Sequence, residues 1–261
     1  MLDGRGGTND GGRPPAPVSV EGDAGDAVTH SLRVLATVYH YNHWIFSLIR
    51  DDLGPAVLEV GAGTGNITQF LLNADRLVCL EPCAPYREYL ARRFASHLNV
   101  AFAARRIEEC PAPDAPESSF DSVVCLNVLE HIDDDAGVLA RFRRLVRPGG
   151  RVIVLVPGSP FLYGAMDRAM GHRRRYTLRG LRRLFTAAGL RPVRCRHVNF
   201  VGALGWWWRG RVRRKDTIPE TQTRLFDRMV PVLSAVERII PPPFGQSVLV
   251  VGEPDGPAPR T

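Results

Sequence analysis

The chain has 261 residues, of which 44% are hydrophobic, and this is enough for the core of one α/β domain. Lys and Arg number 34 against 27 Asp and Glu, and the formal net charge of +7 suits an acidic small molecule, RNA or an anionic membrane surface without selecting among them. The sequence shows no apolar run that could span a bilayer, no signal peptide and no CxxC pair among its 5 cysteines. These absences argue against a zinc or disulfide framework, and we expect a cytoplasmic protein.

Residues 1–25 are rich in Gly, Pro and Asp and predict a disordered tail, and residues 254–261 predict a flexible one. Residues 26–253 alternate between helix-like and strand-like segments, which predicts a single domain. We expect helices over 32–50, 67–72, 86–94, 134–145 and 178–188, and strands over 56–60, 76–81, 99–104, 120–127, 151–157, 192–198 and 246–252. This alternation predicts an α/β fold whose parallel sheet is covered on both faces.

A glycine turn follows the first predicted strand, in the stretch VLEVGAGTG. Gly61, Gly63 and Gly65 can adopt positive φ and let a ligand lie against the backbone. The dinucleotide fingerprint is G-x-G-x-x-G, whereas these glycines alternate and Glu59 stands inside the end of the strand, which departs from a pyrophosphate cradle. Glu81 ends the next strand, where a carboxylate can accept two hydrogen bonds from a ribose diol. The alternative for Glu81 is a solvated charge at a strand end.

Four segments in this order resemble the motifs of the class I S-adenosylmethionine-dependent methyltransferases. They are VLEVGAGTG, LVCLEP, SFDSVVCLNVLEHIDD and LVRPGGRVIVLVP, which together cover roughly residues 56–157. The segment GHRRRYTLRGLRRLFTAAGL also resembles ubiquinone-biosynthesis-like and related small-molecule methyltransferases of types 11–12. The resemblance implies a Rossmann-like sheet of seven mostly parallel strands with an antiparallel last strand, helices on both faces and a helical insert before that strand. It implies S-adenosyl-L-methionine as the cofactor and S-adenosyl-L-homocysteine as the product.

The resemblance also assigns residues to parts of the cofactor. It places Glu59, Gly61, Ala62, Gly63 and Gly65 around the methionine part, Glu81 at the ribose diol, Pro82 beside the adenine, and Asn127 and Val128 along the methionyl moiety. In addition, Tyr41 and Trp44 of the first helix can offer aromatic faces to the sulfonium or the adenine. A core position in that helix is an equal alternative for Trp44.

An oxygen or nitrogen acceptor must lose a proton during methyl transfer, which calls for a nearby general base. Three side chains are candidates for this catalytic role: His131, His172 and Tyr176. His131 follows the fourth strand at the expected mouth of the site, although it equally suits a cap of the next helix. The run HRRRY, residues 172–176, suits either an arginine grip on a carboxylate or phosphate or a solvated helix start. No acidic or histidine cluster has clear ligand spacing, so we expect no metal.

The segment before the last strand, residues 200–245, is longer than ordinary connections. It carries LGWWWRGRVRRK and then the amphipathic stretch LFDRMVPVLSAVERII. We expect this segment, together with residues 28–50, to form a helical cap that closes the acceptor pocket or makes a dimer contact, in a monomer or a homodimer. Tryptophan beside Arg and Lys also suits a membrane surface, and contact through Trp206–Trp208 is the weaker alternative.

We therefore expect an enzyme that transfers a methyl group by in-line displacement to an O, N or C nucleophile of a small molecule, in bacterial secondary or cofactor metabolism such as natural product biosynthesis. The alternatives are methylation of RNA or of a lipid-linked or peptide acceptor, and a non-catalytic cofactor-binding scaffold. The position after the fourth strand reads NVLE rather than an NPPY-like tetrapeptide, so we expect no nucleic-acid partner. The scaffold alternative rests on Arg106, because many family members carry there an Asp that accepts from the adenine amino group, which an arginine cannot do.

Overall fold

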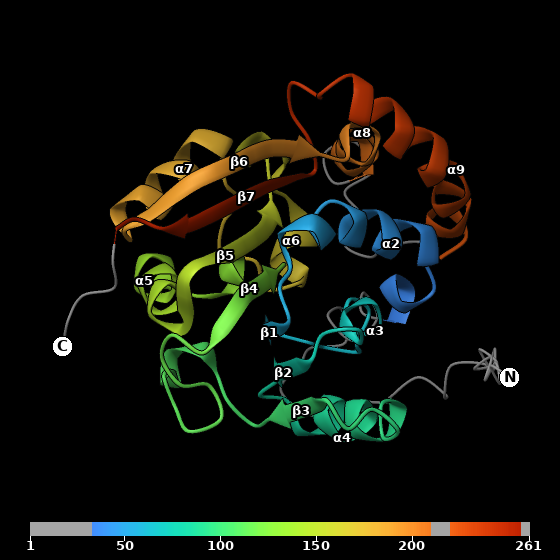
Figure 1. Ribbon diagram of the computed structural model, residues 1–261. Coiled ribbons are helices and arrows are strands. Elements are labelled where there is room, and N and C mark those ends of the chain that lie inside the picture. Colours follow the sequence, from blue (N-terminus) through green and yellow to red (C-terminus); the bar gives the residue numbers. More distant parts are fainter. Residues whose placement is uncertain (1–32, 210–219, 257–261) are drawn as a thin grey trace, which may run out of the picture.

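The computed structural model describes residues 33–209 and 220–256, so the tail expected at residues 1–25 lies outside the described residues (Figure 1). Its centre is a seven-stranded sheet in the order β3-β2-β1-β4-β5-β7-β6. The strands are β1 Ala56–Val60, β2 Arg76–Leu80, β3 Val100–Ala103, β4 Phe120–Leu126, β5 Val146–Pro157, β6 Leu190–Val198 and β7 Ser247–Pro254. Neighbours from β3 to β5 pair in parallel, whereas β7 runs antiparallel to β5 and to β6. The predicted α/β fold with an antiparallel last strand is confirmed.

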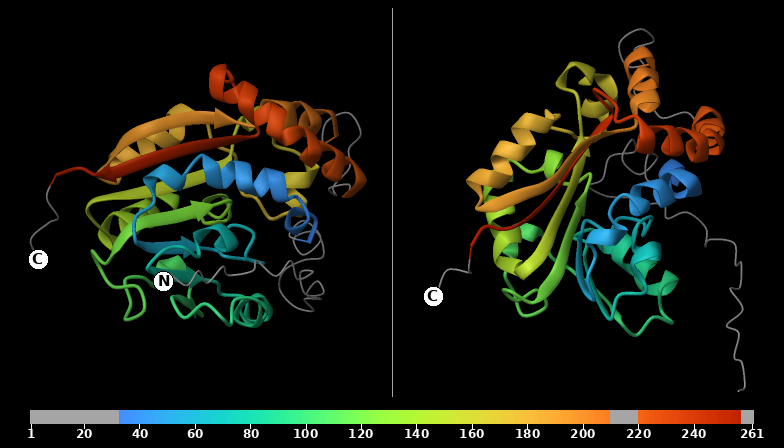
Figure 2. Two further views of the ribbon diagram at one scale, coloured as in Figure 1. Left: turned by 45° about the vertical axis from the view of Figure 1, so that its right-hand side comes forward. Right: turned by 45° about the horizontal axis from the view of Figure 1, so that its top comes forward.

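Helices cover both faces of the sheet, as Figure 2 shows. Apart from short 3-10 turns and the helical residues 33–36, the helices in the described part of the chain are α2 Tyr39–Ser47, α3 Thr68–Leu71, α4 Ala84–Arg93, α5 Asp135–Leu145, α6 Ala165–Ala169, α7 Leu178–Ala187, α8 Phe200–Trp207 and α9 Glu220–Ile239. Alternate side chains of each buried strand face opposite helices. In β4, Val123 packs in the core under α5 and α7, while Val124 packs in the core under α2, α3, α4 and α9. Both cores are closed, which explains why the central strands are apolar throughout.

The helix expected over 32–50 is interrupted. Residues 33–36 are helical, residues 37–38 are not, and a second helix, α2, begins at Tyr39. The new helix start is capped from far along the chain. The carboxylate of Asp227 in α9 accepts hydrogen bonds from the backbone N–H groups of His40 at 3.3 Å and Tyr41 at 2.8 Å. Free N–H groups at a helix start need such an acceptor, and the sequence near Tyr39 contains none that caps it.

The described part of the long insert before β7 forms the expected helices, and these two helices, α8 and α9, lie together at one end of the molecule beside α2 (Figures 1 and 2). Phe226 of α9 approaches Tyr41 of α2 with ring centroids 6.4 Å apart. None of the helices in the described part of the chain has both the length and the apolar character that crossing a membrane requires.

Candidate active site

The glycine turn after β1 has the backbone that its sequence predicts. Gly61, Gly63 and Gly65 all have positive φ, at +76°, +55° and +78°. A Cβ atom at Gly61 would lie 2.4 Å from Cγ2 of Val128, the residue expected along the methionyl moiety. A Cβ at Gly65 would meet α4 instead, at 2.7 Å from Phe94. Gly61 therefore lets β1 and the end of β4 approach each other, and Gly65 serves helix packing.

Two buried carboxylates stand on either side of this turn. Glu81 accepts hydrogen bonds from the backbone N–H of Gly63 at 2.8 Å and of Cys83 at 2.9 Å, so it ties the glycine turn to the end of β2. It is 6% exposed, and this burial contradicts the alternative of a solvated strand end. Glu59 accepts from the hydroxyl of Thr68 at 2.6 Å, and burial raises the pKa of Glu59 to about 7.

A cleft opens over the turn, between the end of β1, the end of β4 and α2. Its lining includes Tyr41, Glu59, Gly61, Ala62, Gly63 and Asn127 among the residues expected to hold the cofactor. Asn127 has a left-handed backbone, with φ +55°, and this turns the chain away at the end of β4. Among the residues that the structure describes, the lining contains the acid Glu59 and no Arg, Lys or His. Its chemistry favours a ligand that carries positive charge.

The expected role of Trp44 in cofactor binding is wrong. Trp44 is 4% exposed and packs in the core between α2 and the sheet, which was the alternative for this residue. On the same helix, Tyr41, Asn42 and Ile45 face the cleft. Tyr41 and Trp44 lie three residues apart on one side of α2, with ring centroids 6.1 Å apart, so the local sequence did not show which of the two reaches the cleft.

A second, larger pocket of about 300 Å³ adjoins the cleft. Tyr41 and Leu35 line both cavities, so the two share a wall. The walls of this pocket come from the segment around α2, from α8, from α9 and from Met166 of α6. They are mainly apolar, while Asn199, Gln222 and Gln246 supply amide groups and Arg209 supplies a guanidinium group. The insert and the first helix thus line a pocket beside the cleft, and whether they close an acceptor pocket or make a dimer contact stays a prediction.

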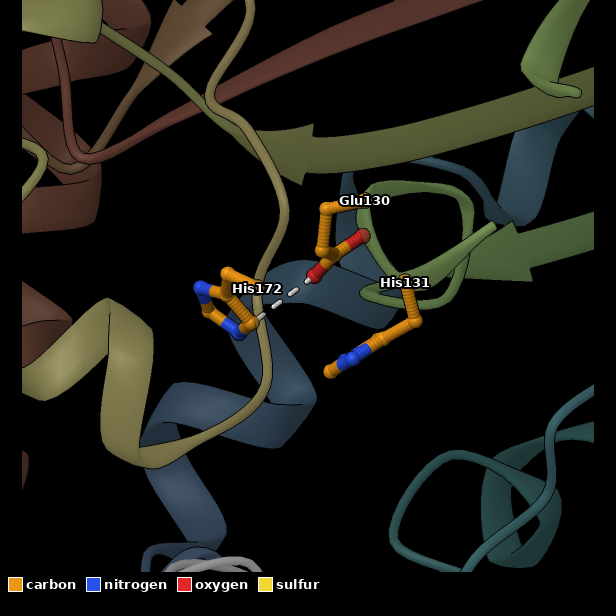
Figure 3. A group of neighbouring side chains, drawn as sticks. All are labelled: Glu130, His131 and His172. Atoms are coloured by element: carbon orange, nitrogen blue, oxygen red, sulfur yellow. Dashed lines mark ion pairs between the residues drawn. The ribbon is translucent and has the colours of Figure 1, made fainter. Parts of the chain in front are cut away.

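Three of the side chains near the end of β4 form a cluster, drawn in Figure 3: Glu130, His131 and His172. Glu130 is fully buried, neither of its carboxylate oxygens has a hydrogen-bond partner, and burial raises its pKa to about 8. The Nε2 atom of His172 lies 3.8 Å from Oε1 of Glu130, and its Nδ1 lies 3.0 Å from Oδ1 of Asp167. Asp167 is itself buried, and it orients the imidazole of His172 toward Glu130.

His131 lies beside this pair, with its ring centroid 5.0 Å from that of His172. Its Nδ1 is 3.2 Å from the carbonyl oxygen of Gly171, and burial lowers its pKa to about 4, so the imidazole is neutral at pH 7. It does not cap the following helix, because Asp134 does so by accepting from Gly137. Candidate ligand atoms of Glu130, His131 and His172 lie within 4.8 Å of one another, a spacing that also suits a metal ion. The expectation that no metal is needed stays a prediction.

The HRRRY run is neither a solvated helix start nor an anion grip, because its arginines are used within the chain. Arg173 pairs with Asp133 at 2.6 Å, Arg174 with Asp135 at 3.1 Å, and the buried Arg175 with Asp167 at 2.7 Å. These pairs tie the run to the loop after β4 and to α6.

Tyr176, expected as a candidate base, is buried. Its hydroxyl donates to Oδ2 of Asp135 at 2.9 Å, and burial together with this carboxylate raises its pKa. A phenol held in this way is suited to a structural role, and the catalytic assignment of Tyr176 stays an untested prediction.

Sequence reasoning missed one member of the cluster, Glu130, and also Asp167, which holds His172. Glu130 stands next to His131 in the motif NVLEHI, but an acid in a loop gives no sign that it will be buried without a partner. Asp167 lies in the stretch AMDRAM, which carries no recognisable signal. Its contacts with His172 and Arg175 depend on a chain reversal through α6.

Comparison with known proteins agrees with this geometry. Residues 58–152 match the family model described as a methyltransferase domain. A ubiquinone biosynthesis O-methyltransferase of Alkalilimnicola ehrlichii is 34% identical over 100 residues, which are 38% of this chain and 40% of that protein. Its counterpart in Xanthomonas oryzae pv. oryzae is 25% identical over 177 residues, covering 62% of this chain and 72% of that protein. The first alignment thus spans less than half of the relative's length.

Among solved structures, the chain is similar to the geranyl diphosphate C-methyltransferase of Streptomyces coelicolor A3(2) in complex with Mg2+, geranyl diphosphate and S-adenosyl-L-homocysteine. The TM-score is 0.60 at 14% identity, over 91% of this chain and 88% of that chain. At this identity the likeness establishes the fold.

Proposed function

We propose that this chain, which contains a class I S-adenosylmethionine-dependent methyltransferase domain, transfers a methyl group to an O, N or C nucleophile of a small molecule. The observation that carries the proposal is the cleft over the glycine turn. It is lined by an acid without any basic side chain, and Glu81 is fixed at its edge. S-adenosylmethionine carries a sulfonium and an ammonium group, so its positive charge suits this lining. A dinucleotide would bring a pyrophosphate, which the lining does not suit.

The residues present fit this cofactor. Each carboxylate oxygen of Glu81 already accepts one backbone N–H and keeps a lone pair for a ribose hydroxyl. Glu59 and Asn127 face the cleft from β1 and β4, where they would meet the amino-acid end. When bound, the cofactor supplies an activated methyl group on sulfur. The chain binds and orients both reactants and excludes water, and the shared wall at Tyr41 aligns the two cavities.

For a hydroxyl or ammonium acceptor, His131 is the general base that we propose. Its Nδ1 faces the Gly171 carbonyl and therefore carries the proton, which leaves Nε2 free to accept one. Its lowered pKa keeps it neutral at pH 7 but also makes it a weaker base than a free histidine, so the assignment rests on the position of its Nε2. Asp167 holds the imidazole of His172 next to that of His131. We propose that His172 takes part in the same proton transfer through this contact between the two imidazole rings.

The acceptor that we propose is a small and mainly apolar molecule with one polar nucleophile. The mainly apolar walls of the pocket beside the cleft, with three amide groups for the polar part of the acceptor, support this class. We place the reaction in bacterial secondary or cofactor metabolism in the cytoplasm. The five free cysteines support a reducing compartment.

The test is calorimetric titration of S-adenosylmethionine and S-adenosylhomocysteine into the wild type, Glu81→Gln and Glu88→Gln. Glu88 is an exposed acid on α4 and provides the matched control. We expect saturable binding that weakens about tenfold or more in Glu81→Gln, because a carboxylate that accepts a ligand hydroxyl contributes about 1.5–3 kcal/mol. Glu88→Gln should bind like the wild type. Absence of binding to the wild type would refute the cofactor assignment. With binding established, transfer of labelled methyl groups to a panel of apolar acceptors identifies the substrate class.

A further inference from the structure

The outer face of α9 carries an apolar stripe with no partner among the described residues. Leu225, Met229, Val232, Val236 and Ile239 are 48–78% exposed. These residues are alternately four and three positions apart. Because each residue of an α-helix turns the chain by about 100°, all five side chains lie within about 40° of one direction. The helix is 20 residues long, so the stripe runs along most of about 30 Å. Scattered exposed apolar residues are normal, whereas a continuous stripe marks an interaction surface.

The charged side chains that α9 exposes to solvent within residues 221–239 are all positive. Arg228 and Arg224 are exposed on one side of the stripe, about 60° and 100° from its centre, and Arg238 is exposed on the same side, about 140° from it. The two acids of residues 221–239 both point inward and are used as helix caps. Asp227 caps α2, and Glu237 accepts from the backbone N–H groups that begin α8. No acidic side chain within that range faces solvent, so the surface combines apolar and purely cationic groups.

The neighbouring helix α8 adds exposed aromatic groups. Trp206 turns inward, where its Nε1 donates to Asp167 at 3.3 Å and its ring lies under the guanidinium of Arg175. Trp207 and Trp208, in contrast, are 44% and 52% exposed. Tryptophan is enriched where proteins meet the headgroup region of a bilayer, since its ring is apolar and its N–H is polar.

We propose that α9, with the end of α8, docks this protein on an anionic lipid bilayer, with the helix lying in the plane of the interface. The apolar stripe would enter the boundary between headgroups and acyl chains, and the arginines at its edge would reach lipid phosphates. Charge decides between this occupant and a second copy of the chain. Symmetric pairing of two α9 faces would bring cationic edges together, whereas an anionic bilayer neutralises them.

The experiment is co-sedimentation of the full chain with vesicles of phosphatidylcholine alone or mixed with phosphatidylglycerol. Neither cofactor nor acceptor is present, so the result is independent of the proposed methyl transfer. We expect binding to the anionic vesicles only. Val232→Glu and Arg228→Glu should each lower the partition coefficient about tenfold or more.

Two matched controls separate docking from net charge. Leu98→Glu introduces the same acid at a fully exposed apolar site away from α9, and Arg92→Glu makes the same charge reversal on α4. Both should bind like the wild type, and circular dichroism should show all four variants folded. Absence of wild-type binding, or an equal loss in the controls, would overturn the proposal. A dimer in lipid-free buffer that Val232→Glu dissociates would assign the face to a second copy instead.

Discussion

Replacement of Glu130 by glutamine tests the buried cluster through its pH dependence. The carboxyl of Glu130 has no partner for either oxygen, and burial raises its pKa from 4.5 to about 8. Between these two pH values the folded protein keeps the proton that the unfolded chain releases. The stability that the protonated carboxyl of Glu130 contributes is therefore fully present below about pH 4.5, and it is lost as the pH rises through about 8. A glutamine has nearly the same shape and does not titrate.

The magnitude follows from the size of this pKa change. At about 1.4 kcal/mol for each pH unit, the wild type can lose at most about 5 kcal/mol relative to Glu130→Gln between pH 4.5 and 8. Local rearrangement around the charged carboxylate reduces the loss, and we expect about 2–5 kcal/mol. Glu59, whose pKa is also raised, to about 7, is present in both proteins, so its contribution cancels in the difference.

The assay is urea unfolding of both proteins at intervals from pH 4.5 to 9, with EDTA present so that metal binding does not contribute. The difference in the free energy of unfolding should grow in favour of Glu130→Gln with rising pH and level off above about pH 8. A difference that stays constant across this range would show that Glu130 is ionised in the folded protein and that the argument from burial fails. The absolute difference at any one pH is not diagnostic, since an amide changes the local packing.

Three further substitutions probe the site and its cap. Gly61→Ala should destabilise the protein by about 1–3 kcal/mol in thermal unfolding, since its Cβ would meet Val128 and its φ is positive; an unchanged melting temperature would contradict the close approach. Asp227→Asn should cost about 1–2 kcal/mol and increase hydrogen exchange at the start of α2, because a neutral amide caps the helix less well than a carboxylate; unaltered exchange there would argue against the cap. Tyr176→Phe should cost about 1 kcal/mol through the lost bond to Asp135 and leave methyl transfer unchanged, whereas loss of turnover in a folded variant would support the catalytic role.

The parts of the fold that the sequence predicts are those set by local patterns. Apolar runs identified the seven strands, and Gly189, at φ +72°, follows the end of α7 as a glycine at a helix end should. The position of Glu81 at the end of β2 followed from its distance to the glycine turn, because both lie in one strand-helix-strand unit.

The parts that the sequence could not predict depend on contacts between distant segments. The interruption before α2 exists because Asp227, 187 residues after His40, supplies the cap. The buried pair of Asp167 and Arg175 could not be distinguished from solvated charges, since only the folded chain withdraws both from water. Which of the neighbouring rings of Tyr41 and Trp44 reaches the cleft depends on where α2 packs, and the period of a helix alone does not determine this.

The two inward acids of α9 have a geometric consequence for the pocket beside the cleft. Asp227 holds the start of α2 and Glu237 holds the start of α8, and both helices form walls of that pocket. Ten residues of α-helix fix the two attachment points about 15 Å apart. The two walls of the pocket are thus attached to one helix, and the length of that helix contributes to their separation. We expect single substitutions in the lining to alter the shape of the pocket more than this separation.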